Sequence, residues 1–445
     1  MIRVRTRTDS REASGPATMR LLDWFGGPDE RTVSFGGSYF EGPRLPAAAE
    51  DLLRFAGSVY CADRIVGRSR GDDRWTREIT LEVGFSRPDS WNAASEDLLA
   101  AIRFLSGDHW SLRIRRGKGG LRAVREMPAQ QTFEDFDAVC LFSGGLDSLC
   151  GALHLLDQGH SLILLGHYEA GLASRRQSLL AASLTDRFGA ERVRLHQLRL
   201  GPASSASGQA RPLENDNENT TRARSLLFIA AGISLAHALG PAVPLYVPEN
   251  GFIGINVPLR GSRTGSSSTR TTHPWFLDRL LAALQTLGID NPIENPFVHA
   301  TKGEVLSSVD SAVLSGLAPT ALSCAHPEAL RWIKVSGGNC GSCLPCIIRR
   351  AGMHKVGLDD PDDYAFDPLR EEGFLDPNRG RAADALAVFS SLRSSPGPLA
   401  IFRNGTVPWN QANAFREVHR RGLDELRSWI EAQGSSEVRA MITVS

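Results

Sequence analysis

The stretch Ser143-Gly144-Gly145-Leu146-Asp147-Ser148 decides the fold that we expect for this chain. It follows the apolar run 138–142 and precedes an apolar segment with helical character. A strand, a glycine-rich turn and the start of a helix form a cradle for an oxyanion. The glycines let the backbone approach closely, and the first N–H groups of a helix have no partner within it. Ser143 and Ser148 add hydroxyl donors, and the Asp147 carboxylate can hold Mg²⁺ against phosphates.

The same stretch differs from one phosphate-binding motif and resembles another. No Lys followed by Ser or Thr comes after the glycines, so the stretch is not a Walker P-loop. The pattern S-G-G-x-D-S resembles the PP-loop of ATP pyrophosphatases, which cleave ATP between the α and β phosphates and pass AMP to a carbonyl oxygen. The alternative is an ordinary glycine-rich turn between a strand and a helix. The whole motif in this context favours the PP-loop.

The composition of the chain is that of an ordinary globular protein. At 445 residues, with 42% hydrophobic and 22% charged residues, it has room for two or three domains. Fifty basic residues balance fifty acidic ones, so the net charge does not indicate a nucleic-acid partner. No apolar run reaches the roughly 18 residues of a membrane span, and no apolar signal core follows the basic N-terminus. We therefore expect a cytoplasmic protein that binds neither a membrane nor nucleic acid.

From residue 136 onward, apolar strand-like and helix-like segments alternate. Strands are expected at 138–142, 161–166, 192–198 and 243–247, and helices at 147–157, 174–188, 221–239 and 274–287. This spacing predicts an α/β fold, a parallel sheet with helices on both faces of the Rossmann-like, PP-loop kind. Ligands of such sheets bind at the carboxyl ends of the strands, where the glycine-rich turn lies. Two polar loops interrupt the pattern at 201–219 and 261–272, and the first is expected to be a mobile lid or disordered.

The two ends of the chain differ from this central part. Residues 1–133 are expected to form an N-terminal α+β domain, with strands at 52–60, 79–85 and 110–115 and a helix near 96–105. After the PP-loop domain, 136–357, the acidic stretch 359–363 is interpreted as a linker. The C-terminal extension, 358–445, is expected to be helical, with helices at 382–392 and 412–433.

Four of the seven cysteines form the second motif. Cys340, Cys343 and Cys346 follow one another at short, equal intervals, and Cys324 lies upstream. Four thiols with this spacing match a closed, structural Zn²⁺ site. An iron–sulfur cluster is the alternative, but such runs supply a fourth cysteine just downstream, and none follows Cys346. The spacing therefore favours a zinc site where the PP-loop domain meets the helical extension.

Both motifs belong to a longer pattern that resembles the 7-cyano-7-deazaguanine synthase family, the PP-loop and zinc enzymes of queuosine biosynthesis. The resemblance covers roughly residues 136–357. Besides the PP-loop, the segments that carry it are His167-Tyr168-Glu169, Arg175-Arg176-Gln177, Thr221-Arg222-Ala223-Arg224-Ser225-Leu226-Leu227-Phe228, Pro274-Trp275-Phe276-Leu277, the stretch 296–305 with Thr301-Lys302, Ser323-Cys324, and the stretch 340–349.

The chain also departs from that family. Biosynthetic members are about half as long, and the stretch 247–256 replaces their aspartate-rich segment, which leaves the identity of the substrate open. The N-terminal stretches 59–64, 75–77 and 106–110 look like those of enlarged synthase-like proteins encoded in bacterial antiphage clusters of the Qat and CBASS kinds.

The resemblance implies an ATP-dependent carbon–nitrogen ligase. In the family, ATP activates the carboxylate of 7-carboxy-7-deazaguanine as an acyl adenylate, ammonia gives the amide, and a second activation gives the nitrile. Asp147 and Lys302 are then expected to act in catalysis. The implied cofactors are ATP, Mg²⁺ and Zn²⁺. The residues expected to bind ATP are Ser143, Gly144, Gly145, Leu146, Asp147, Ser148, Arg222 and Arg224, and the zinc ligands are Cys324, Cys340, Cys343 and Cys346.

Several alternatives stay open at this point. Arg222 and Arg224 could be surface residues at a helix start, and Lys302 could be solvated. The acceptor could be ammonia or an amine on a partner protein, which the additional domains favour. The chain could instead be a catalytically silent nucleotide-sensing scaffold of a defence complex. A tRNA-modifying PP-loop enzyme is the third possibility, although it would require a basic RNA-binding surface.

Overall fold

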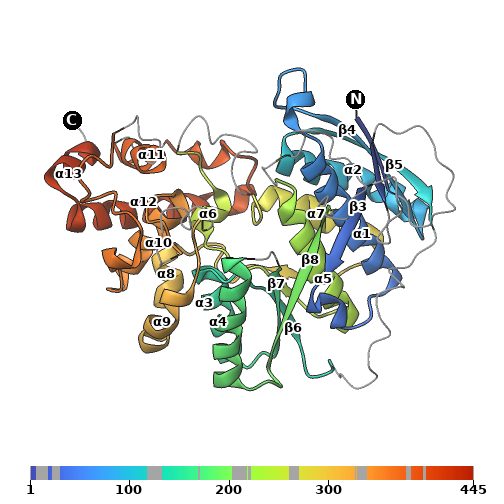
Figure 1. Cartoon of the computed structure of the whole chain (residues 1–445), viewed down its shortest axis with the longest axis horizontal. Helices are drawn as coiled ribbons and strands as arrows, with labels where there is room; N and C mark the ends of the chain where they lie inside the picture. The colour runs from blue at the N-terminus through green and yellow to red at the C-terminus, as the bar shows by residue number, and fades with distance from the viewer. Residues whose placement is uncertain are drawn as a thin grey trace.

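A computed structural model describes residues 2–6, 19–22, 31–117, 133–168, 171–202, 218, 222–259, 270–325, 327, 338–376, 382–393 and 397–443 (Figure 1). Its strands are β1 (Ile2–Thr6), β2 (Met19–Leu22), β3 (Arg31–Gly36), β4 (Glu78–Phe85), β5 (His109–Arg116), β6 (Ala138–Leu141), β7 (Leu162–His167), β8 (Val193–Pro202), β9 (Leu245–Tyr246) and β10 (Ile293–Glu294). Its α-helices are α1 (Ala47–Ile65), α2 (Pro88–Ser106), α3 (Leu146–Asp157), α4 (Leu172–Phe188), α5 (Arg224–Leu239), α6 (Gly251–Ile255), α7 (Pro274–Leu287), α8 (Lys302–Ser307), α9 (Ser311–Leu317), α10 (Leu344–Lys355), α11 (Ala383–Leu392), α12 (Ala412–Gln433) and α13 (Ser436–Ile442).

The described strands form one ten-stranded sheet in the order β10-β9-β6-β7-β8-β3-β2-β1-β4-β5. The five strands from β10 to β8 pair in parallel, which confirms the parallel sheet expected for the central part of the chain. The five strands from β3 to β5 are also parallel to one another. The two groups meet where β3 pairs antiparallel with β8.

Successive residues of the central strands face different cores. Val139 of β6 packs in the same cluster as Leu227 of α5, whereas Cys140 packs with Leu149 of α3 and Leu180 of α4. This alternation follows from the two-residue period of a strand. Helices therefore cover both faces of β6 and β7, and the turn after β6 is left at the edge of the sheet, between the layers.

The strand expected at 52–60 is wrong, because these residues belong to helix α1. Nearly every residue from Leu52 to Tyr60 is buried. The polar residues of this segment, Arg54 and Ser58, are buried as well, so no exposed face distinguishes one side of the helix from the other. Its sequence is therefore hard to distinguish from that of a buried strand. The strands expected at 79–85 and 110–115 and the helix near 96–105 are confirmed as β4, β5 and α2.

The N-terminal residues and the PP-loop part share one hydrophobic core. Helix α1 and helix α5 contribute to the same cluster of buried residues. The Tyr39 hydroxyl donates to the Ala231 carbonyl of α5 (3.0 Å), and the Ser234 hydroxyl donates to the Ala49 carbonyl of α1 (3.1 Å). The two parts pack continuously. Their division into separate domains, 1–133 and 136–357, therefore stays a prediction.

The C-terminal helices gather at the end of the molecule opposite the N-terminal strands (Figure 1). Helices α11 and α12, expected at 382–392 and 412–433, are confirmed. The stretch 359–363 was expected to be a linker, and this is wrong for its first residue. The Asp359 carboxylate is buried and accepts from Arg350 (3.3 Å) and from the Trp429 indole (3.0 Å). The predicted loops 201–219 and 261–272 lie mostly outside the described residues. None of the described helices combines the length and the apolar character needed to cross a bilayer.

Candidate active site and metal centre

The turn between β6 and α3 has the shape of an oxyanion cradle. Gly144 has a φ of 79°, a conformation that favours glycine, and a Cβ there would make a tight contact of 3.3 Å with the backbone nitrogen of Gln177. The Gly145 N–H donates to the Ser143 hydroxyl (3.3 Å), and the Ser148 hydroxyl donates to the Gly145 carbonyl (3.0 Å). These bonds hold the first turn of α3 with its N–H groups at the carboxyl end of β6, where an anion can accept them.

Asp147, on the first turn of α3, has a partner on each carboxylate oxygen. The Lys302 ammonium donates to Oδ1 (2.7 Å), and the Asn250 amide donates to Oδ2 (2.8 Å). Lys302 is only 4% exposed, which excludes a solvated helix start for this residue. The structure thus brings the two predicted catalytic residues into direct contact from helices that are distant in the sequence.

Glu249 follows β9 and reaches the same place. Its Oε2 accepts a short hydrogen bond from the Thr272 hydroxyl, while its backbone N–H donates to the Asn295 side chain (3.3 Å). Burial and, to a smaller extent, the nearby Asp147 charge raise the pKa of Glu249 to about 7, against the lowering effects of Thr272 and Lys302. A carboxyl group with a raised pKa of this kind is a candidate for proton transfer near neutral pH.

Several of these groups open onto one cavity of about 490 Å³, a volume typical of small-molecule sites, whereas Gly144, Ser148, Asn250 and Thr272 do not line it. Its lining includes Ser143, Gly145, Asp147, Arg224, Glu249, Lys302 and Cys324. Two cations and a cradle of N–H donors on one wall suit a ligand with several anionic oxygens.

The two arginines expected to bind ATP point to different places. Arg224, the first residue of α5, lines the cavity. Arg222 instead stacks over the Trp75 ring at 4.3 Å and donates to the Ser106 carbonyl (3.2 Å). Burial and the charge of Arg68 lower the pKa of Arg222 to about 10. The structure therefore brings Arg224 to the cavity and places Arg222 against the N-terminal part.

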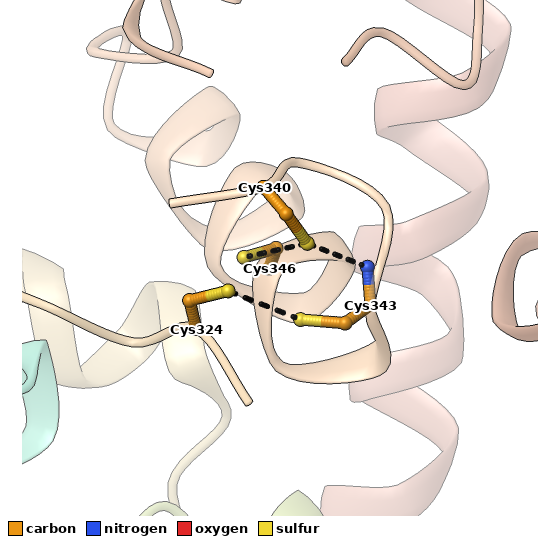
Figure 2. Close-up of side chains that lie close together, drawn as sticks. All are labelled: Cys324, Cys340, Cys343 and Cys346. Atoms are coloured by element: carbon orange, nitrogen blue, oxygen red, sulfur yellow. Dashed lines mark hydrogen bonds between the residues drawn. The ribbon is translucent and has the colours of Figure 1, made fainter. Parts of the chain in front are cut away.

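The thiols of Cys324, Cys340, Cys343 and Cys346 point toward one another (Figure 2). Their sulfur atoms all lie within 4.8 Å of one another, with 4.0 Å between Cys324 and Cys343 and 3.8 Å between Cys340 and Cys346. Zinc–sulfur bonds of about 2.3 Å in a tetrahedron require sulfur–sulfur distances of about 3.8 Å. The cluster could therefore hold Zn²⁺, and four thiols would leave no coordination position open for a substrate.

The metal centre adjoins the cavity through Cys324, which lines both. Contacts with Cys324, and then with Cys343 and Cys346, hold the pKa of the Cys340 thiol below its usual range. A thiolate is the form that binds a metal. Because Cys324 lies on a different segment from the other three ligands, a bound metal would tie the cavity wall to the turn before α10.

The residues also fit Mg²⁺ bound together with nucleotide phosphates. Mg²⁺ takes one or two carboxylates and completes its shell with phosphate oxygens and water. The hydrogen bonds from Lys302 and Asn250 use one acceptor site on each Asp147 oxygen, and each carboxylate oxygen has a second. The carboxylate can therefore take a cation without losing Lys302 or Asn250.

Sequence reasoning missed Glu249, Asn250 and Thr272. The first two lie in the stretch 247–256, which departs from the aspartate-rich segment of the resembled family. The position of the stretch could have revealed them. It directly follows β9, and the carboxyl end of β9 lies at the same sheet edge as that of the parallel strand β6. Asn250 also caps α6 by accepting from the Ile253 N–H (3.0 Å), which fixes the side chain that holds Asp147.

Comparison with curated proteins gives similarity to enzymes named 7-cyano-7-deazaguanine synthase. The protein from Novosphingobium aromaticivorans is 26% identical over 240 residues, which cover 51% of this chain and 94% of that enzyme. The protein from Thiobacillus denitrificans is 27% identical over 242 residues, 51% of this chain and 98% of the enzyme. The protein from Sulfolobus acidocaldarius is 23% identical over 256 residues, 54% of this chain and 50% of the enzyme. No family model matches the chain.

These relatives correspond to about half of the chain, and nearly the whole of the first two enzymes is covered. The described fold is mixed α/β with parallel strands, as expected for a PP-loop enzyme. About half of this chain lies outside the part that aligns with the first two enzymes.

Proposed function

We propose that this chain is an ATP-dependent ligase that adenylates the carboxylate of a 7-deazaguanine, releases pyrophosphate, and then joins the acyl group to an amine. The observation that carries the proposal is the cavity itself. It unites the PP-loop, the Asp147–Lys302 pair and Arg224 in the part of the chain that is similar to 7-cyano-7-deazaguanine synthases.

The chemistry follows from the residues present. A carboxylate is a poor electrophile, and AMP on its oxygen provides a leaving group. The N–H groups at the start of α3 and the Ser143 hydroxyl bind phosphate oxygens, while Lys302 and Arg224 neutralise the charge on the departing pyrophosphate. Mg²⁺ would add further neutralisation of the phosphates. Lys302 is already held by Asp147, so its ammonium needs no reorganisation before the reaction.

Product analysis tests the proposal. Purified full-length protein is incubated with α-labelled ATP, Mg²⁺ and 7-carboxy-7-deazaguanine, and the nucleotide products are separated. AMP and pyrophosphate that depend on the carboxylate support the proposal, while ADP contradicts cleavage between the α and β phosphates. A chain without turnover would instead favour the scaffold function, and turnover dependent on tRNA would favour RNA modification.

We further propose that the amine belongs to a partner protein and that the role is antiphage defence. About half of the chain lies outside the part that aligns with the synthase relatives. Ammonia needs no recognition surface, so this additional part supports a protein as the amine donor. The defence role rests on the N-terminal resemblance alone. Intact-mass analysis of candidate partner proteins after the reaction tests the first point. An acyl-deazaguanine mass increment on the partner supports it, and formation of free amide alone contradicts it.

A further inference from the structure

The proposed reaction needs a group that accepts a proton. When a neutral amine attacks an acyl adenylate, its nitrogen becomes positively charged and must lose a proton before the amide is stable. Arg224 cannot accept it, because a guanidinium stays protonated. Lys302 donates to Asp147, and Asp147 also accepts from Asn250. These residues of the cavity are thus engaged in binding charge.

Glu249 is the second carboxylate that lines the cavity. It accepts from the Thr272 hydroxyl and forms no ion pair with a described residue, whereas Asp147 is paired with Lys302. The backbone of Glu249 is fixed on both sides, since its N–H donates to the Asn295 side chain and its carbonyl accepts from the same amide (2.8 Å). The side chain is therefore held in place at the wall of the cavity.

The surroundings of Glu249 suit proton transfer at neutral pH. The charged groups around it are Asp147 from α3, Lys302 from α8 and Arg224 from α5, and Thr272 donates to it from the segment before α7. Burial, followed by repulsion from Asp147, brings the pKa of Glu249 to about 7. A base works best when its pKa lies near the working pH.

Building on the proposed function, we propose that Glu249 is the general base that takes the proton from the attacking amine. The nitrogen lone pair forms the new bond to the acyl carbon. The bond from that carbon to the AMP oxygen breaks, and its electron pair leaves with AMP. The proton moves from nitrogen to the Glu249 carboxylate and then to water, so neither an oxidant nor a further reactant is needed.

The role makes a prediction that separates the two half-reactions. Glu249 is needed for amide formation but not for adenylation, because no proton leaves nitrogen in the first step. The test uses full-length wild-type protein, Glu249→Gln, and the control Glu431→Gln, whose carboxylate lies on the exposed face of α12. Glutamine keeps the shape of the side chain and can still accept from Thr272. Melting temperature and zinc content are compared first, and all three proteins should agree.

Two activities are then measured with 7-carboxy-7-deazaguanine as substrate. Carboxylate-dependent exchange of labelled pyrophosphate into ATP, without an amine, reports adenylation. Mass spectrometry reports product formation with ammonium chloride and, separately, with hydroxylamine. For Glu249→Gln we expect exchange within about three-fold of wild type and amide formation reduced about 100-fold or more. Hydroxylamine should restore most of the rate, because its attacking nitrogen gives up a proton to water more readily.

Each other outcome has a distinct meaning. If Glu249→Gln lowers exchange and amide formation equally, the residue serves adenylation, metal binding or substrate binding, and the base role is wrong. If the variant matches wild type with ammonia, the base role is also wrong. If Glu249→Gln slows the reactions with ammonia and with hydroxylamine by the same factor, the variant has lost something other than proton transfer, and the base role is wrong. If wild type itself shows no carboxylate-dependent exchange, the proposed function fails, and the base assignment fails with it.

Discussion

In the N-terminal part, Arg77 lies between Asp63 and Asp108; at the cavity, Asp147 lies between Lys302 and Asn250. In the first cluster, all four carboxylate oxygens accept hydrogen bonds from within the chain, and Arg77 is fully buried. In the second, cations face an open cavity. Arg224, Lys302, Asp147 and Glu249 line this cavity and can contact a ligand, and the adjoining four thiols can hold a metal.

This difference teaches how to distinguish structural from chemical polar clusters. Burying a charge is costly, and it is tolerated when opposite charges and hydrogen bonds are supplied nearby. The Arg77 cluster meets this condition completely and joins α1, β4 and the start of α5. At the cavity, the chain supplies only some of the opposite charges and hydrogen bonds. This is expected where a bound ligand supplies the rest.

The largest effect is expected when one of the four thiols is replaced, so that the metal they require can no longer bind. Cys343→Ser should abolish metal binding and strongly lower the yield of folded protein, because binding free energy at such a site is folding free energy. Elemental analysis should find about one zinc per wild-type chain, negligible iron, and no zinc in the variant. Cys61→Ala, in the buried N-terminal core, is the matched control and should retain the metal. A stable, metal-free Cys343→Ser protein would contradict a structural role.

The second test breaks the self-sufficient cluster. Asp108→Ala leaves Arg77 and Arg68 without the carboxylate that both contact, at 2.6 and 2.9 Å. Arg77 keeps Asp63, but Arg68 loses its carboxylate, and breaking a buried ion pair in this way costs about 3–5 kcal/mol in stability. Chemical denaturation followed by fluorescence measures the loss, with the exposed Asp72→Ala as control. A change below about 1 kcal/mol would mean that the cluster does not need its internal pairing.

The third test removes the negative charge at the cavity while keeping the size of the side chain. Asp147→Asn should reduce carboxylate-dependent pyrophosphate release about 100-fold or more, because a charge that organises the phosphates is lost. Its effect on stability should be smaller than that of Asp108→Ala, since Lys302 borders a cavity that water can enter. Thermal melting and product analysis on the same preparation measure both. If Asp147→Asn destabilises the protein as much as Asp108→Ala, the contrast between the clusters is wrong.

The same contrast explains how much of the fold the sequence predicted. Amphipathic segments such as α7 and α12 were predicted at the observed bounds, because one polar face reveals the helical period. Helix α1 was mistaken for a strand, because only Arg54 and Ser58 interrupt the apolar run 52–60, although with Asp51 they recur at helical spacing. The antiparallel pairing of β3 with β8 joins residues on opposite sides of a long intervening sequence. No local pattern predicts such a contact.

The site was predictable where its chemistry is local. The PP-loop and the cysteine run are short patterns that imply their own geometry. Arg222 and Arg224 were treated as a pair, but residues two positions apart at a helix start project in different directions. Glu249 acquires its properties from burial and from Thr272, which comes from a distant segment. Properties that depend on such tertiary contacts do not show in the sequence.

The smallest expected effect concerns that contact between Thr272 and Glu249. A hydrogen bond donated to a carboxylate favours its ionised form, so the Thr272 hydroxyl lowers the pKa of Glu249. Thr272→Val removes the donor with little change in volume and should raise this pKa. The base form would then dominate only at higher pH. The rate of amide formation is measured against pH and divided by the concentration of free amine. The pH at which this rate is half-maximal should move upward from about 7 by roughly one pH unit. Thr272→Ser keeps the donor and should leave the midpoint unchanged; a downward shift in Thr272→Val, or an equal shift in both variants, would contradict the role of the hydroxyl.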